Sequence, residues 1–357
     1  MKPLTQKGKD LAWFLSLIFL LAASGFVATS GFKKSQVLVD LSENPTPLGY
    51  TKSLILFALP CLVFGYWMLT HREIRVRRKA FWITVLLMFP LGVLLDVFLG
   101  LQFFTFENHN SVLGSRYEFC ILWGYDVRQG LAGLPGPGWH KFIPVEEVFF
   151  YFLGFVAILL TYIWADEVIF RQNRVSLEQP IPAVFSEWKR TILFWLVIGM
   201  VLFSVALAIR SHVKPEGDHA FPGYFLFLLL TAIVPSMACS RLAFYFVNFR
   251  ALTLAWLFVI SISQLWEACL AIPYQWWGYR HDQMMGWFIK PQCNLPVEAV
   301  LVWTLSTWAT ALVFETIQNV LRLKEMKKGT TLRNALRGEA ENVRSLQQHY
   351  HTTRQAR

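Results

Sequence analysis

The chain has 357 residues, of which 55% are hydrophobic, 16% aromatic and 16% charged, with a formal net charge of +10. Soluble domains carry about a quarter charged residues, so this composition excludes an ordinary soluble protein. The basic residues gather in short segments between apolar runs, which indicates orientation in a membrane and argues against a nucleic-acid partner.

Eight apolar segments follow one another along the chain, each close to the roughly 20 residues that a helix needs to cross a bilayer. They are residues 11–31, 52–70, 81–104, 145–165, 190–209, 222–240, 251–272 and 297–320. We predict an all-α, polytopic helical membrane bundle, because lipid cannot satisfy open backbone groups. The first segment also resembles a signal peptide, and cleavage after it is the alternative.

The distribution of Lys and Arg predicts the orientation of these spans. Of the 33 basic residues, 23 lie in the segments 1–10, 71–80, 166–190, 241–250 and 321–357. Cytoplasmic loops carry such an excess, so we expect the N- and C-termini inside. The expected location is a bacterial inner membrane, and the expected partner of the basic charge is membrane lipid.

Two motifs occur twice in the chain. The triplet Trp-Gly-Tyr at 123–125 returns at 277–279, an offset of 154. The stretch "IPVEEVFFY" at 143–151 returns as "LPVEAVLVW" at 295–303, an offset of 152. Each half therefore places a Trp-Gly-Tyr loop shortly before a Pro-Val-Glu that opens a span.

An acid also precedes each Trp-Gly-Tyr motif near the end of a span, Asp96 in the first half and Glu267 in the second. Four spans per half predict parallel repeats related by an axis along the membrane normal. We expect a first repeat over 1–170, a second over 185–322 and a basic cytoplasmic tail over 323–357.

The acids of the repeated motifs are the candidate catalytic residues, and they are Asp96, Glu146, Glu147, Glu267 and Glu298. Pro followed by Glu is also ordinary helix-initiation chemistry, which suffices for one such motif alone. The repetition favours a site that the two halves share. Burial favours the protonated form of a carboxylic acid, which can then protonate a carbon–carbon double bond.

Aromatic faces stabilise a carbocation of the kind that such protonation forms. Rings near the motif acids are therefore the expected substrate-binding residues; the alternative is that they only anchor span ends in the lipid interface. They are Trp123, Tyr125, Phe150, Trp276, Trp277, Tyr279 and Trp303.

The remaining polar residues indicate no further chemistry. Asp166, Glu167 and Glu315 lie near the other ends of spans, where we expect interfacial residues. Cys120 and Cys293 fall in predicted outer loops, where a disulfide is chemically possible. No Cys/His cluster predicts a metal site, and no glycine-rich fingerprint after a strand predicts a bound dinucleotide, so no cofactor is expected.

Three motifs follow one another in the chain: an acid in a span, then Trp-x-Tyr, then Pro-x-Glu-Glu-x-x-Phe-Phe. This order resembles that of the membrane-integral lycopene cyclases, which are the heterodimeric or fused, non-flavin type. "PVEEVFF" at 144–150 carries the strongest likeness, and 266–303 supports it. The resemblance covers roughly 81–166 and 251–320. It implies acid-initiated, redox-neutral cyclisation of a hydrophobic isoprenoid, with lycopene as substrate.

By the same resemblance, Glu146 and Glu147 match the paired acids of the family and Glu298 matches the first acid of the second motif. Asp96 and Glu267 match the upstream acids. The second motif departs from the pattern, because Ala299 replaces the expected second acid.

Further departures leave the substrate open. The spans 11–31 and 190–209 are additional to a three-helix core in each half, and the segment 102–143 is longer than the pattern requires. A cyclase for a different isoprenoid is therefore the alternative.

Alternatives of other classes are also open. A non-enzymatic transporter would have intramembrane acids in helices broken near mid-membrane, for which Pro60, Pro90 and Pro235 are candidates. A prenyl-protein protease would need Arg at the place of Tyr151. A membrane dioxygenase would need histidines in spans, whereas the eight histidines fall in loops or the tail.

Overall fold

The structure is a computed structural model, whose described residues are 38–71, 74, 76–113, 122–126, 138–173, 188–212 and 222–326, with the isolated residues 12, 15, 16 and 19. Most of the first predicted span and most of the predicted tail lie outside these residues. So do Cys120 and most of the linker between the two predicted repeats.

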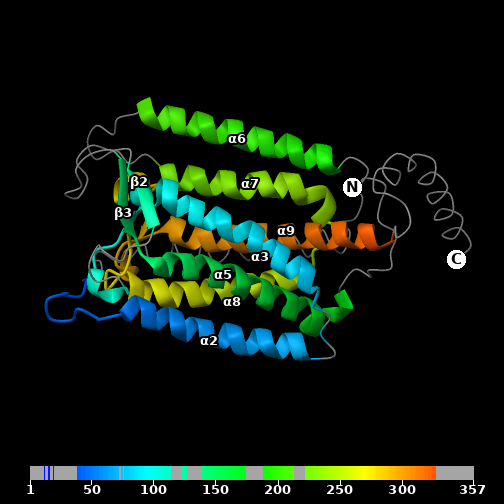
Figure 1. Cartoon of the computed structure of the whole chain (residues 1–357), viewed down its shortest axis with the longest axis horizontal. Coiled ribbons are helices and arrows are strands. Elements are labelled where there is room, and N and C mark those ends of the chain that lie inside the picture. Colours follow the sequence, from blue (N-terminus) through cyan, green and yellow to red (C-terminus); the bar gives the residue numbers. More distant parts are fainter. Residues whose placement is uncertain are drawn as a thin grey trace, which may run out of the picture.

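Long helices run side by side through the molecule (Figure 1). They are α2 (Gly49–Thr70), α3 (Arg78–Leu95), α5 (Val145–Trp164), α6 (Trp188–His212), α7 (Gly223–Ala243), α8 (Phe249–Trp266) and α9 (Val297–Met326). Five helical stretches are long and apolar enough to cross a membrane, namely Gly49–Thr70, Arg78–Phe103, Val145–Ile169, Phe249–Ala271 and Val297–Arg322. By length and composition, the chain is therefore a helical membrane protein.

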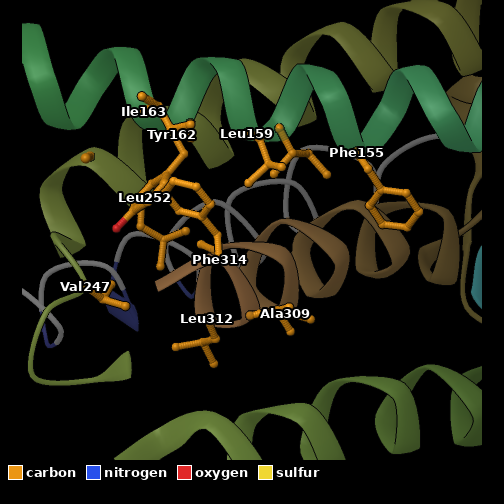
Figure 2. Packing of buried hydrophobic residues seen from close by; sticks show 14 of the residues in the cluster. Phe155, Leu159, Tyr162, Ile163, Val247, Leu252, Ala309, Leu312 and Phe314 are labelled. Atoms are coloured by element: carbon orange, nitrogen blue, oxygen red, sulfur yellow. The ribbon is translucent and has the colours of Figure 1, made fainter. Parts of the chain in front are cut away.

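The centre of the bundle is α5, which packs against α2, α3, α8 and α9. Figure 2 shows Leu159 and Tyr162 of α5 pointing toward α9, where Phe314 meets them. The outermost helix is α6, which packs on α7 (Figure 1). Apolar residues on the outward surfaces of α2 and α6 are exposed, as expected for helices that face lipid.

Three short π-helical segments interrupt the long helices near their ends: η1 (Asp96–Gly100), η4 (Ala165–Ile169) and η7 (Glu267–Ala271). Each contains at least one buried acid, and η1 and η7 begin with the two upstream acids of the repeated motifs. Single π turns occur frequently at functional sites. By contrast, α2, α3 and α7 continue through Pro60, Pro90 and Pro235.

Short strands close one end of the bundle, which we call the strand end. They are β1 (Phe104–Thr105), β2 (Leu122–Asp126), β3 (Gly138–Ile143), β4 (Gly278–Tyr279), β5 (Phe288–Ile289) and β6 (Leu295–Pro296). The other short elements are α4 (Leu101–Phe103) and the 3₁₀ turns η2 (His109–Ser111), η5 (Arg171–Asn173), η8 (His281–Gln283) and η9 (Lys290–Gln292). All the strand pairs are antiparallel: β1 with β4, β2 with β3, and β5 with β6.

The strand pairing places the two Trp-Gly-Tyr motifs differently. The first lies in β2, which pairs with β3 just before α5. In the second, Gly278 and Tyr279 form β4, which pairs with β1 from the first half of the chain. The equivalence of the two motifs, expected from the sequence, is therefore not present in the strand pairing.

A close contact between α3 and α5 leads to a stability prediction. A Cβ atom at Gly92 would lie 2.5 Å from Cδ1 of Tyr151, whereas one at Gly65 would lie 3.6 Å from the nearest atom of Leu160. We expect Gly92→Ala to lower the melting temperature in detergent, because overpacking costs about 1–3 kcal/mol.

Gly65→Ala is the matched control, since it adds the same methyl group to a helix at ordinary contact distance. Alanine favours a helix by up to about 1 kcal/mol over glycine, so this variant should be as stable as the native chain or more so. A Gly92→Ala protein that melts no lower than the Gly65→Ala protein would contradict the tight α3–α5 contact.

Candidate functional site

The strand end brings all five predicted acids into buried positions. Two lie in the first turn of α5 and one in the first turn of α9, and the other two begin the π segments after α3 and α8. Their exposed fractions are 1% for Asp96, 2% for Glu146, 7% for Glu147, 3% for Glu267 and 0% for Glu298. Buried carboxyl groups are costly unless they are paired, so their partners define what each one does.

Asp96 and Glu147 form a pair. Their carboxyl groups lie close enough to interact electrostatically, and Oδ2 of Asp96 is buried without a hydrogen-bond partner among the described residues. Each also accepts a tyrosine hydroxyl: Tyr151 donates to Asp96 Oδ1 at 3.1 Å, and Tyr50 donates to Glu147 Oε1 at 2.7 Å. Because like charges inside a protein repel one another, this pairing suits a site in which one of the two carboxyl groups is protonated.

Glu267 has a different set of partners. The indole of Trp303 donates to Oε1 at 2.8 Å, and the hydroxyl of Tyr279 donates to Oε2 at 2.9 Å. The hydroxyl of Ser263 lies 3.5 Å from Oε1, one helical turn earlier. Because an indole N–H can only donate, this arrangement uses Glu267 as a hydrogen-bond acceptor.

Glu146 and Glu298 anchor loops. Oε1 of Glu146 accepts the backbone N–H of Leu113 at 2.8 Å and the hydroxyl of Thr51 at 2.5 Å. Oε1 of Glu298 accepts the backbone N–H of Met285 at 2.5 Å. Both N–H groups lie two residues after a 3₁₀ turn, η2 in the first case and η8 in the second. The same device therefore holds the corresponding loop against each helix start.

Aromatic rings lie between the carboxyl groups. Phe150 is central, with ring centroids 5.6 Å from Trp266, 5.8 Å from Trp277 and 5.5 Å from Trp303. It also lies 5.6 Å from Tyr151, which bonds to Asp96. The ring cluster thus contacts the hydrogen-bond donors of both Asp96 and Glu267.

Other predicted aromatic residues lie elsewhere. Trp276 stacks on Tyr50 and donates its indole N–H to Thr46 Oγ1 at 3.1 Å, which holds the segment before α2 in place. For Trp123 and Tyr125 the structure describes only the backbone, which lies in β2 opposite Lys141 and Trp139.

Three tyrosines of this site were not predicted. Tyr151 lies four residues after Glu147, so helical spacing places it on the same face of α5, and this signal was available in the sequence. Tyr50 and Tyr224 each lie near a helix start outside any repeated motif. Tyr224 interacts electrostatically with Asp96, Glu147, Glu267 and Glu298, so it lies among the acids of both halves.

Asp166, Glu167 and Glu315 are buried inside the protein, with exposed fractions of only 5–6%. At the end of the bundle opposite the strands, the hydroxyl of Tyr162 donates to Glu315 Oε1 at 2.9 Å. The amide of Asn248 donates to Asp166 Oδ1 at 2.9 Å. Packing of the end of α5 against α8 and α9 buries these acids as a second polar cluster.

Within the described part of the chain, no group of three or more His, Cys, Asp and Glu side chains is arranged to hold a metal ion. Cys293 is a free thiol there. Outside the spans, burial raises the pKa of Tyr279 well above its usual range, and the nearby charge of Glu267 adds to this effect. Tyr279 therefore stays a neutral hydrogen-bond donor.

Comparison of the chain with protein-family models, with curated proteins and with solved structures finds no match.

The loop-anchoring role of Glu298 leads to a prediction that separates its charge from its hydrogen bond. Glu298→Gln keeps an oxygen that can accept the Met285 N–H, so we expect its melting temperature in detergent to stay near the native value. Glu298→Ala leaves this N–H without its partner and should cost about 1–3 kcal/mol. If both substitutions lowered the melting temperature equally, the loop-anchoring role of the Glu298 hydrogen bond would be contradicted.

Proposed function

We propose that the chain is a membrane-embedded isoprenoid cyclase that acts by acid-initiated, redox-neutral cyclisation. The observation that carries the proposal is the buried Asp96–Glu147 pair beside an aromatic cluster centred on Phe150. A proton held between two carboxyl groups in an apolar surrounding is a proton donor that water does not compete for.

The first step would be transfer of the shared proton from the pair to the terminal trisubstituted alkene of the substrate, which forms a tertiary carbocation. The next double bond attacks this cation, and one carbon–carbon bond closes the ring. The faces of Phe150, Trp277 and Trp303 would stabilise the positive charge, at about 0.5–2 kcal/mol for each favourable contact.

The last step would be loss of a proton from the ring cation to Glu267. Trp303 and Tyr279 hold this carboxylate as an acceptor, which suits a base. The reaction is an isomerisation, because one proton is added and one is removed. We assign the return of the proton to the pair to the hydroxyl of Tyr224, and its electrostatic interaction with both sets of acids supports this role.

The resemblance to membrane-integral lycopene cyclases makes lycopene the first substrate to test. A different isoprenoid is the alternative, because Ala299 stands where that family has a second acid. The partners of the reaction are then the isoprenoid and the surrounding lipid.

Continuity of the helices favours an enzyme over a transporter. Transporter sites are typically formed by helices that are unwound near the middle of the membrane. Here α2, α3 and α7 continue through Pro60, Pro90 and Pro235. The π segments that hold acids lie near helix ends instead.

We also propose eight spans in two parallel repeats, with both termini on the cytoplasmic side of a bacterial inner membrane. The paired anchors support the repeats: Leu113 with Glu146, and Met285 with Glu298. The N–H donor and the glutamate that accepts its hydrogen bond are 33 residues apart in the first half and 13 in the second. The first half thus has about 20 extra residues, and these include the β2–β3 pair.

Expression in a lycopene-accumulating bacterial host tests the function, with the pigments separated by chromatography. We expect a cyclic carotene with the native chain, and at least a hundredfold less with Glu147→Gln or Asp96→Asn, because a general acid contributes about 10²–10⁴-fold.

Glu146→Gln and Glu298→Gln are the matched controls, since each amide can accept the same backbone N–H. Each substitution keeps the hydrogen bond and loses only its charge assistance, which is worth about 1 kcal/mol. The amount of cyclic carotene should therefore fall less than tenfold. Unchanged lycopene, with the protein shown to be in the membrane, would reject lycopene as the substrate. Cyclisation that survives Glu147→Gln would reject the carboxyl pair as the proton donor.

A further inference from the structure

A cavity of about 330 Å³ opens at the strand end beside the carboxyl groups. It lies between β1, β4 and the start of β6, and Leu38 also lines it. Its polar lining consists of Thr105, Glu107, Gln275, Tyr279, His281 and Asn294. Its volume is within the range of small-molecule sites, which is roughly 300–1,000 Å³.

The backbone around this cavity is strained. Gln275, Cys293 and Asn294 line it and have φ angles of 55°, 51° and 57°, in the left-handed region that favours glycine. They are three of the five non-glycine residues with positive φ in the described part of the chain. Such residues cost about 1–3 kcal/mol each and cluster at ligand sites, where the surrounding structure holds them.

Hydrogen bonds hold Gln275 in this conformation. The side-chain amide of Gln275 donates to the backbone carbonyl of Val39 at 3.1 Å. The backbone carbonyl of Gln275 accepts the backbone N–H of Asn108 at 3.0 Å. The N–H of Val39 donates in turn to the carbonyl of Pro273 at 2.9 Å. Three segments distant in sequence thus fix one wall of the cavity.

The cavity and the carboxyl site share two residues. Tyr279 lines the cavity and donates its hydroxyl to Glu267 at 2.9 Å. Trp277 also lines the cavity, and its ring centroid lies 4.9 Å from that of Tyr50, which bonds to Glu147. A molecule that fills the cavity therefore touches Tyr279, a partner of Glu267, and Trp277, which contacts the Tyr50 partner of Glu147.

The charges of the residues that line the cavity limit which head groups it can bind. Among the described residues that line the cavity, there is one carboxylate, Glu107, and no Lys or Arg. Burial lowers the pKa of His281 below its usual 6.5 and outweighs the nearby Asp282, so His281 is neutral at pH 7. A diphosphate would find no cation here, whereas a hydroxyl or amide group would find hydrogen-bonding partners.

We propose that this cavity binds the neutral, hydrogen-bonding head group of an amphipathic isoprenoid, whose hydrocarbon tail passes Trp277 and Tyr279 toward the carboxyl groups. The proposal rests on the proposed function and narrows its substrate class. It predicts that an isoprenoid alcohol or a similar neutral derivative binds more tightly than a prenyl diphosphate, and more tightly than lycopene, which has no polar group.

The test measures binding with the purified full chain in detergent, so it does not depend on turnover. Farnesol, farnesyl diphosphate and farnesene share a C15 isoprenoid chain and differ at the head. Cys293 lines the cavity, so its modification by methyl methanethiosulfonate is followed by mass spectrometry of its peptide. Cys269, which is exposed and outside the lining, is the internal reference.

Farnesol at ten times its Kd should slow modification of Cys293 about tenfold and leave Cys269 unchanged. It should also raise the melting temperature, a readout that does not depend on thiol reactivity. Farnesene and farnesyl diphosphate should neither slow the modification of Cys293 nor raise the melting temperature. No melting-temperature shift with farnesol, or an equal effect of farnesene, would overturn the proposal.

Glu107→Lys tests the charge argument at an exposed position. Removing the carboxylate and adding a cation should allow farnesyl diphosphate to protect Cys293 and raise the melting temperature. Absence of both effects would show that the head group lies elsewhere.

Glu147→Gln distinguishes this proposal from the proposed function. It should abolish cyclisation while farnesol binding persists, because Glu147 does not line the cavity. Head-group selectivity without any cyclised product would retain the binding site and reject the cyclase. Cyclisation of lycopene without head-group selectivity would retain the cyclase and reject the head-group site.

Discussion

The structure of the strand end depends on one constraint, which is that a carboxyl group removed from water needs hydrogen-bonding partners. Five such groups lie within a few residues of helix ends, and each organises what surrounds it. Glu146 and Glu298 hold loops, and Glu267 holds an indole and two hydroxyls. Because these partners come from different helices and loops, satisfying the acids also fixes how the helices meet.

The acids of the two halves are alike in position and unlike in pairing. Glu146 and Glu298 accept equivalent N–H groups, but the next residue is Glu147 in one half and buried Ala299 in the other. Asp96 therefore has a second carboxyl group beside it, while Glu267 has only donors around it. In the proposed mechanism, this difference assigns proton donation to the pair and proton acceptance to the single group.

Seven of the eight predicted apolar segments coincide with described helices, and five helical stretches are long and apolar enough to cross a membrane. Apolar length and composition predict these five because the bilayer fixes how long a span must be. Repetition picked out the five acids of the strand end. The partners could not be found in this way: Tyr50 and Tyr224 reach the acids only through helix packing. Burial of Asp166 and Glu315 likewise depends on how α5, α8 and α9 meet, which the local sequence does not specify.

Burial of the acids is consistent with the chemistry proposed for them. A transporter coupled to protons must exchange them with water on both sides of the membrane. A cyclase that only rearranges bonds returns each proton it donates, so its acids need no path to water during turnover. Carboxyl groups that are at most 7% exposed meet that requirement. The same closed arrangement explains why a cavity for the polar part of a substrate would lie outside the carboxyl cluster, behind Tyr279.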